Sequence, residues 1–197
     1  EIDENYAQIE AIWQNLFELF EDEAKKKNIV FHYKVDVEHK HILTDVTKIE
    51  EIFVNIMSNA MKYTLSGGFV TVNVEELPCD ESGYIIVRTR VSDTGIGMSQ
   101  DYLTKIFEPF TREQSTTKSK VTGTGLGMSI VKKYVALLGG TINVESELGE
   151  GSVFTVTLKH KIADKSYYAK KYVENQETGS EILKGRNVLL AEDNDLN

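Results

Sequence analysis

Two asparagines and a lysine are the residues best suited to chemistry, because their spacing can bring them together. Asn55, Asn59 and Lys62 are separated by four and then three positions, so on a helix they lie along one face. Amide oxygens are hard ligands that suit Mg²⁺, and a lysine ammonium suits phosphate. The spacing therefore predicts a site for a metal-bound phosphate compound. Either asparagine taken alone is better explained as a loop cap or a side chain in water.

A glycine turn follows the second of two strand-like runs. It reads Asp93-Thr94-Gly95-Ile96-Gly97 and is followed by Met98. Glycines two positions apart permit positive φ and let the backbone approach a flat ligand. A carboxylate at this strand end can accept a hydrogen bond from an exocyclic amine such as that of adenine. By itself the turn is a common one, and Ile96 and Met98 are more simply core residues than a shelf for a base.

A second glycine turn, Gly123-Thr124-Gly125-Leu126-Gly127, stands directly before an apolar helical stripe that begins at Met128. Backbone amides and a helix N-terminus converge there, which predicts an anion-binding site. The turn lacks the Walker pattern, and the polar segment before it does not fit a dinucleotide fold. That polar segment, residues 111–122, is explained equally well as a lid over a bound nucleotide or as a plain loop.

The composition limits the class of protein that carries these turns. The chain has 197 residues, of which 41% are hydrophobic and 27% charged, which suits one sizeable core. The formal net charge of −9 argues against a general nucleic-acid or acidic-membrane binder. Cys79 is the single cysteine, so no internal disulfide can form and a reducing, cytoplasmic location is expected. The sequence contains no run of about 18 apolar residues, so no membrane span is predicted.

Hydrophobic periodicity predicts the elements that must position these groups. Helices are expected over residues 2–27, 47–66, 100–107 and 128–138. Strands are expected over residues 29–35, 69–74, 84–91, 141–145 and 153–158. Thr47 and Glu50 have capping-box spacing at the start of the second helix. Helices and mostly antiparallel strands segregate along the chain, which favours an α+β two-layer sandwich.

Four boxes in this order resemble the catalytic and ATP-binding domain of sensor histidine kinases, a branch of the superfamily that includes gyrase, Hsp90 and MutL. They are Asn55–Thr64, Asp93–Gly97, Phe107-Glu108-Pro109-Phe110 and Gly123–Gly127, and residues 149–152 resemble the family's last glycine box. The resemblance spans residues 5–160. It implies the superfamily's sandwich, a mixed and mostly antiparallel sheet covered by helices on one face.

The same resemblance implies that ATP and Mg²⁺ are the ligands. The implied contacts are Asn55, Asn59, Lys62, Tyr63, Asp93, Gly95, Ile96, Gly97, Met98, Phe107, Phe110, Thr124, Gly125, Leu126, Gly127 and Met128.

Each implied contact has a role in the family. Asn59 binds Mg²⁺ with help from Asn55, Lys62 and Tyr63 reach the phosphates and the outer face of the nucleotide, and Asp93 accepts from the adenine amine with Gly97 and Met98 beside the base. Phe107 and Phe110 anchor the lid, and the backbone of residues 124–128 supplies amides to the phosphates. Arg112 and Lys118 or Lys120 are candidate contacts to the γ-phosphate.

One departure from the superfamily bears on the reaction. Hydrolysing members place a glutamate four residues before the metal-binding asparagine, and Asn55 stands there in this chain. An amide cannot act as a general base, so hydrolysis of ATP is disfavoured. Glu51, one turn earlier, could substitute in principle, but a helical wheel turns it further toward solvent.

The phosphoacceptor that a histidine kinase needs is not evident in this chain. None of the four histidines has the expected helical context, and all are interpreted as surface residues: His32, His39, His41 and His160. We therefore expect residues 1–27 to be a helix connecting from an upstream phosphoacceptor and dimerisation domain, which this domain, residues 28–162, would phosphorylate. The fragment alone is not expected to autophosphorylate.

The C-terminal part of the chain predicts a further domain. Residues 163–185 are expected to be a linker, and residues 186–197 contain an apolar strand ending in Glu192-Asp193-Asn194. This strand resembles the start of a response-regulator receiver, whose acidic pair helps to bind Mg²⁺. The expected parent is a hybrid histidine kinase, a homodimer that works with a response regulator and binds no nucleic acid.

Two other functions remain open at this point. The shared boxes also fit an ATPase of the gyrase class, with Glu51 in the place of the missing base. A degenerate kinase module that serves only protein contacts is the third possibility, and the intact boxes make it the weakest.

Overall fold

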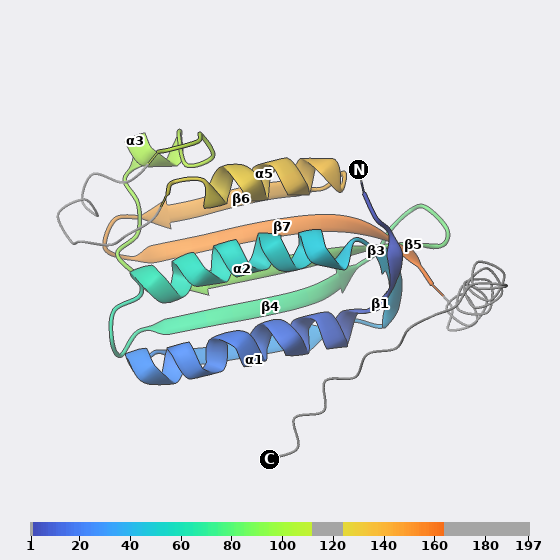
Figure 1. Ribbon diagram of the computed structural model, residues 1–197, viewed down its shortest axis with the longest axis horizontal. Helices are drawn as coiled ribbons and strands as arrows, with labels where there is room; N and C mark the ends of the chain where they lie inside the picture. The colour runs from blue at the N-terminus through green and yellow to red at the C-terminus, as the bar shows by residue number, and fades with distance from the viewer. Residues whose placement is uncertain (1, 112–123, 164–197) are drawn as a thin grey trace, which may run out of the picture. The chain divides into compact units, whose positions relative to one another are not determined.

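The computed structural model describes residues 2–111 and 124–163, which form a sheet with helices on one face (Figure 1). The strands are β1 (Asn5–Gln8), β2 (Val30–Asp36), β3 (His41–Thr44), β4 (Phe69–Leu77), β5 (Tyr84–Asp93), β6 (Thr141–Glu147) and β7 (Gly151–Ile162). The helices are α1 (Ile9–Lys27), α2 (Val46–Tyr63), α3 (Gln100–Leu103) and α5 (Gly127–Leu137). Within the described residues the strand order is β1-β3-β7-β5-β4-β2, and β6 pairs with β7. The predicted α+β two-layer sandwich is confirmed.

Alternation of buried and outward residues sets the middle of the sheet. Val72 of β4 pairs with Val91 of β5, which pairs in turn with Phe154 of β7, and all three are buried. These pairings are antiparallel, whereas β2 runs parallel to β4. A parallel pair needs a long crossover, which here contains β3 and α2. The resulting sheet is mixed and mostly antiparallel, as predicted.

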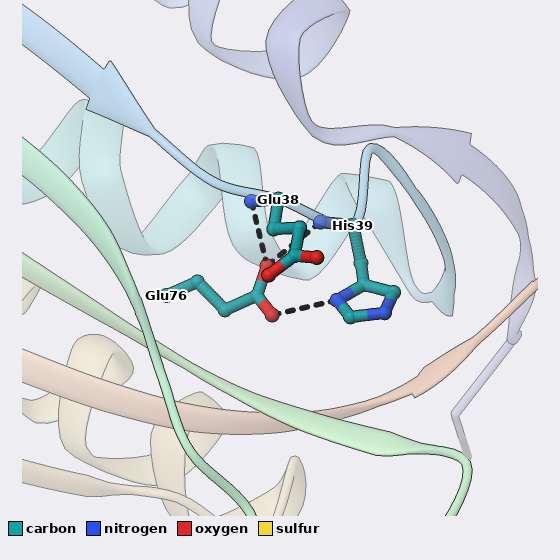
Figure 2. A group of neighbouring side chains, drawn as sticks. All are labelled: Glu38, His39 and Glu76. Atoms are coloured by element: carbon teal, nitrogen blue, oxygen red, sulfur yellow. Dashed lines mark hydrogen bonds and ion pairs between the residues drawn. The ribbon is translucent and has the colours of Figure 1, made fainter.

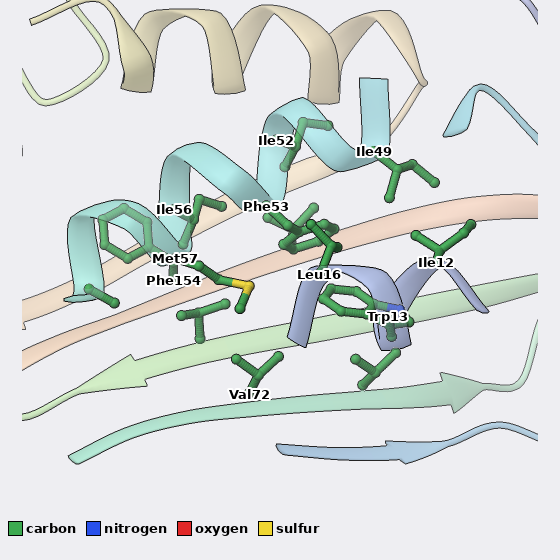
Figure 3. Packing of buried hydrophobic residues seen from close by; sticks show 14 of the residues in the cluster. Ile12, Trp13, Leu16, Ile49, Ile52, Phe53, Ile56, Met57, Val72 and Phe154 are labelled. Carbon is green, nitrogen blue, oxygen red and sulfur yellow. The ribbon is translucent and has the colours of Figure 1, made fainter. Parts of the chain in front are cut away.

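The core lies between this sheet and the helices α1 and α2 (Figure 3). Trp13 of α1 and Phe53 of α2 meet with ring centroids 4.5 Å apart, and they are 3% and 2% exposed. Phe17 of α1 stacks on Tyr33 of β2 at 3.7 Å. Burying one aromatic side chain contributes roughly 2–3 kcal/mol. Helix α1 is therefore part of this core, and the described residues belong to one compact unit.

The N-terminal segment differs from its prediction. A helix was expected from residue 2, but Asn5–Gln8 is strand β1, which pairs antiparallel with β3. Tyr6 occupies a helical position in the sequence pattern, yet its hydroxyl lies 2.7 Å from Nδ1 of His41 and the two rings stack. Pairing with a strand 35 residues away outweighs local periodicity here. The described residues 2–27 thus contain a strand and a helix that complete this sandwich.

The start of α2 also differs from its prediction. The N-cap is Asp45, whose Oδ1 accepts from Lys48 N at 3.1 Å. The expected capping box of Thr47 and Glu50 was therefore wrong by two positions. Burial raises the pKa of the Asp45 carboxyl, but hydrogen bonds from the Lys48 side chain and from the backbone of Asp3 and Lys48 outweigh it and leave the pKa lowered. An ionised cap at this helix end stabilises α2.

The interpretation of all four histidines as surface residues was wrong for one of them. His160 continues the inward alternation of Leu158 on β7 and is 6% exposed. Burial lowers its pKa to about 4, so the ring is neutral in the folded state at neutral pH. The strand was predicted to end at residue 158, and two further residues would have placed His160 in the core.

No helix among the described residues is long and apolar enough to cross a membrane. The expected linker (residues 163–185) lies outside the described part of the chain except for Ala163. The expected receiver strand (residues 186–197) and the candidate lid residues Arg112, Lys118 and Lys120 also lie outside it.

Candidate functional site

A cavity of about 360 Å³ opens between α2, the turn after β5 and the start of α5. Such a volume falls in the range of small-molecule and cofactor sites. The lining residues are Asn55, Ser58, Asn59, Ala60, Lys62, Tyr63, Asp93, Ile96, Gly97, Met98, Tyr102, Ile106, Thr111, Thr124, Gly125, Gly127, Met128, Ser152 and Phe154. The α2 residues and both glycine turns, distant in sequence, therefore meet at one site.

The asparagines lie on the wall formed by α2. Asn55 donates its amide nitrogen to the carbonyl of Glu51 at 2.7 Å, which leaves its oxygen as an acceptor. A Cβ on Gly127 would lie only 2.6 Å from that oxygen. The Asn55 oxygen is therefore held against the first residue of α5, where a helix N-terminus favours anions.

The start of α5 has the features of an anion site. No side chain of the described residues caps this helix, whose N-cap is Leu126. The first amides of a helix have no partner within the helix, so they are available to a negatively charged ligand. Lys62 and Tyr63 line the same cavity from the end of α2, with the Lys62 ammonium 5.1 Å from the centre of the Tyr63 ring. Asparagine oxygens, a lysine and helix amides fit a metal-bound polyphosphate.

Asp93, at the end of β5, lines the cavity on the side of the first glycine turn. Its Oδ1 accepts from the Gly95 amide at 2.8 Å, and the Ser152 backbone also donates to this carboxyl. Burial raises the pKa of Asp93 to about 6, although these hydrogen bonds oppose the shift. At neutral pH a buried carboxylate therefore faces the cavity as a hydrogen-bond acceptor, which suits an amine donor on a ligand.

Two of the glycines are required by the protein's own packing. Gly97 has φ 64°, and a Cβ there would lie 1.9 Å from the Glu147 carbonyl oxygen. Gly125 has φ 72°, and a Cβ there would lie 2.9 Å from the backbone of Phe110. Side chains would therefore push apart the turns that form the cavity wall, whether or not a ligand is bound.

Four of the predicted contacts lie beside the cavity and do not line it. Gly95 is buried, and a Cβ there would lie 2.7 Å from the Tyr63 carbonyl oxygen. Phe107 packs against the core, with the Lys132 ammonium 5.4 Å above its ring. Phe110 is 75% exposed at φ 63° and donates its N–H to Gly125 O at 2.9 Å. Leu126 is the N-cap of α5. These residues hold the neighbouring turns in place.

Sequence reasoning missed several lining residues: Ser58, Ala60, Tyr102, Ile106, Thr111, Ser152 and Phe154. Ser58 lies three positions after Asn55, and the helical spacing alone could have found it. Ser152 and Phe154 share the inward alternation of β7, so the strand pattern carried the signal. Thr111 gave no signal in the sequence.

Glu51, considered as a substitute base, does not line the cavity. It is exposed, and its hydrogen bond with Tyr134 of α5 raises the pKa of the tyrosine. Among the described lining residues Asp93 is the one carboxylate, and it lies at the strand end, not beside Asn59.

A second cluster of possible metal ligands lies away from this cavity, where Glu38, His39 and Glu76 meet (Figure 2). Glu76 Oε2 accepts from the backbone N–H of Glu38 and His39 at 2.9 and 2.8 Å, and Oε1 lies 2.7 Å from His39 Nδ1. Burial raises the pKa of Glu76, but the hydrogen bonds from His39 and Glu38 outweigh it and leave the pKa lowered. These contacts tie the β2–β3 loop to β4 and account for the cluster without an ion.

Comparison with known proteins identifies the unit that carries the first cavity. The family described as histidine kinase-, DNA gyrase B-, and HSP90-like ATPase matches residues 44–162. The autoinducer 2 sensor kinase/phosphatase LuxQ of Vibrio parahaemolyticus is 38% identical over 160 residues. That match covers 79% of this chain and 18% of LuxQ, so the chain spans less than one fifth of this relative.

Solved structures agree with the sequence match. Full-length ShkA in complex with AMPPNP is 31% identical with a TM-score of 0.68, covering 83% of this chain and 32% of ShkA. The catalytic domain of histidine kinase ThkA is 26% identical with a TM-score of 0.64, covering 79% and 95%. ThkA in complex with the response regulator TrrA is 25% identical with a TM-score of 0.62, covering 81% and 42%.

The family match includes α2, both glycine turns and the strands β5 and β7, which together form the cavity. The chain therefore belongs to the histidine kinase-, DNA gyrase B- and HSP90-like ATPase family, with the fold of a histidine kinase catalytic domain.

Proposed function

We propose that this chain binds Mg-ATP and is the catalytic domain of a sensor histidine kinase, which transfers the γ-phosphate to a histidine on a separate domain. The observation that carries the proposal is the single cavity shared by an amide pair, a helix N-terminus and a buried carboxylate. A bound nucleotide in the related ShkA, solved with AMPPNP, supports the same assignment.

The base would lie at the Asp93 end of the cavity. The carboxylate accepts a hydrogen bond from the adenine amino group, which guanine cannot offer at the same position. Met98 and Phe154 line the cavity as apolar surfaces for a flat ring. An unpaired buried carboxylate costs about 1–3 kcal/mol, so a base without this amine would bind more weakly.

The phosphates would lie between α2 and α5. The amides at the start of α5 and the Lys62 ammonium stabilise negative charge. The side-chain oxygens of Asn59 and Asn55 are the groups that would hold Mg²⁺, and amide oxygens match its preference for hard ligands. Bound Mg²⁺ would supply charge neutralisation at the phosphates. The protein's part is to hold the nucleotide in one orientation.

The missing general base favours transfer to an imidazole over hydrolysis. Activation of water needs a basic group within hydrogen-bond reach, and Asn55 offers only an amide. A neutral imidazole is itself a nucleophile and needs no such base. This argument favours the kinase over the gyrase-class ATPase.

The wider assembly belongs to the same proposal. We infer a hybrid kinase with an upstream phosphoacceptor domain, a receiver strand within residues 186–197, homodimerisation, a response-regulator partner and a cytoplasmic location for this domain. LuxQ, a sensor kinase and phosphatase, and ThkA, solved with a response regulator, support this inference.

Calorimetric titration with AMPPNP, with and without Mg²⁺, tests the binding. We expect Asn59→Ala to remove most of the metal-dependent part of the affinity. Asn143→Ala on the exposed face of β6 serves as a matched control and should bind as the wild type does. Equal metal dependence in Asn59→Ala would refute the assignment of this ligand.

Phosphotransfer is tested separately. The chain is mixed with a phosphoacceptor domain supplied in trans and with γ-labelled ATP. Label on the acceptor histidine, with negligible release of free phosphate, is the expected result. Steady turnover to free phosphate that disappears in Glu51→Gln would favour the ATPase instead.

A further inference from the structure

Three hydrogen bonds meet at one hydroxyl that lies behind the cavity wall. Ser146 Oγ of β6 donates to the Gly151 carbonyl at 2.6 Å and accepts from Met98 N at 2.9 Å. It also lies 3.0 Å from Ser152 Oγ of β7. Ser146 does not line the cavity, whereas Met98 and Ser152 do. It therefore contacts two lining residues from behind.

The direction of the serine–serine hydrogen bond follows from counting protons. A hydroxyl has one proton and two acceptor lone pairs. The proton of Ser146 is used by the Gly151 carbonyl, and one lone pair accepts from Met98 N–H. Only a lone pair remains for Ser152, so Ser152 must be the donor in the contact between the two hydroxyls. Ser152 is then left with lone pairs alone.

Ser152 stands beside Asp93 at the same end of the cavity. The two residues are partners in the register of β7 and β5, and both are 8% exposed. The Ser152 backbone N–H also donates to the Asp93 carboxyl. Two acceptors, the Asp93 carboxylate and the Ser152 hydroxyl oxygen, therefore lie side by side, and neither offers a proton to a ligand.

We propose that Ser146 is a specificity-determining positioning residue, which fixes the Ser152 hydroxyl as an acceptor so that the cavity selects an amino group over a carbonyl on the bound base. An amine donates to these acceptors directly or through a water. A carbonyl oxygen has no proton to donate, so it is repelled by their lone pairs. The inference rests on the proposed binding of ATP and goes beyond it, because it assigns selectivity to a residue behind the wall.

The Ser146→Ala variant separates this role from simple packing. Without the Ser146 acceptor, the Ser152 hydroxyl can turn its proton into the cavity and donate to a carbonyl. We expect affinity for ATP to fall and affinity for inosine triphosphate, which carries a carbonyl in place of the amine, to hold or rise. The ratio of the two affinities should drop by about three- to tenfold. If Ser146 had a purely structural role, the substitution would weaken the binding of both nucleotides equally.

The experiment is calorimetric titration of the full chain with ATP and with inosine triphosphate, each with Mg²⁺. Ser146→Thr keeps the hydroxyl and should keep the wild-type ratio, whereas Ser152→Ala removes the acceptor and should lower it. Asn143→Ala, on the same strand but exposed, controls for changes in β6. If Ser146→Ala does not fold, the ratio of affinities measured in Ser152→Ala tests the inference.

The outcomes are distinct. An unchanged ratio in Ser146→Ala, or in Ser152→Ala, would overturn the inference while leaving ATP binding intact. Wild-type protein that binds neither nucleotide would instead refute the proposed function.

Discussion

The side-chain oxygen of Asn55 packs against Gly127 so closely that a Cβ on this glycine would lie only 2.6 Å from it. The contact joins the middle of α2 to the first residue of α5. It links the amide that we assign to the metal with the helix end that we assign to the phosphates. The two groups are therefore placed by one shared contact, and a change at either residue moves the other.

Gly127→Ala should impair binding much more than folding. The new methyl group meets the end of a flexible side chain, which can turn aside at a cost of about 1 kcal/mol or less. Turning Asn55 aside removes a metal-positioning oxygen, so Mg²⁺-dependent affinity for AMPPNP should fall about 10- to 100-fold. Thermal unfolding and calorimetry on the same sample measure both effects. Gly97→Ala, whose Cβ meets backbone at 1.9 Å, should by contrast destabilise the fold.

Binding of ATP should weaken as the pH falls through about 6. The pKa of Asp93 is about 6 in the folded protein, and the adenine amine binds the ionised form better than the protonated form. Affinity measured from pH 8 to pH 5 should therefore decline near pH 6. Asp93→Asn should bind weakly at every pH. A wild-type profile that is flat across this range would contradict the role of Asp93.

The same residue affects folding with the opposite sign. Because burial raises its pKa above the ordinary value of 3.8, Asp93 favours the folded state most below that pH. Its contribution is lost as the pH rises through about 6. Asp93→Asn should therefore be more stable than the wild type at pH 7, and the difference should shrink at pH 4. Denaturant unfolding at the two pH values measures this change.

His160 should destabilise the folded protein in mild acid. Its pKa is lowered from 6.5 to about 4 by burial, so the unfolded chain takes up a proton before the folded chain does. The contribution of the neutral ring is present above pH 6.5 and is lost as the pH falls toward 4, on the order of 2–3 kcal/mol. His160→Gln should lose less stability over this range. His32→Gln, at an exposed position on β2, should follow the wild-type curve.

Glu76 should stabilise the β2–β3 loop without a metal. Glu76→Gln weakens acceptance from two backbone amides and from His39, so the free energy of unfolding should fall by about 1–2 kcal/mol. Glu81→Gln, at a half-exposed pair with Lys159, should change it by less than about 0.5 kcal/mol. A chelator should leave the wild-type unfolding temperature unchanged, and a drop would indicate that an ion contributes.

Long periodic segments could be predicted from the sequence, and pairings between distant segments could not. The stripe on α2 and the alternation of β4 and β5 are local patterns, and all three elements are found close to their expected bounds. The local pattern predicts a helix at Asn5–Gln8, but these residues form strand β1 because they pair with β3. The parallel pairing of β2 with β4 likewise depends on the crossover and not on local periodicity.

The site was predictable where chemistry and spacing coincide. Asn55, Asn59 and Asp93 carry polar groups at element positions that the pattern already defined, and all three line the cavity. Ser152 and Phe154 line it as well, but their role depends on the register between β7 and β5. Ser146 acts from behind the wall, where no sequence pattern separates it from any other strand serine.

The position of β7 has a consequence for the order in which the molecule is completed. This strand pairs with β5 along one edge and with β3 and β6 along the other, although it is the last of the described strands in the chain. During synthesis on the ribosome, the β1–β3 pair therefore lacks its partner strand β7 until residue 162 has emerged. Ser152 and Phe154 arrive with this strand, so the base end of the pocket forms only as the sheet closes. A nucleotide would then bind only the finished domain and stabilise it by mass action.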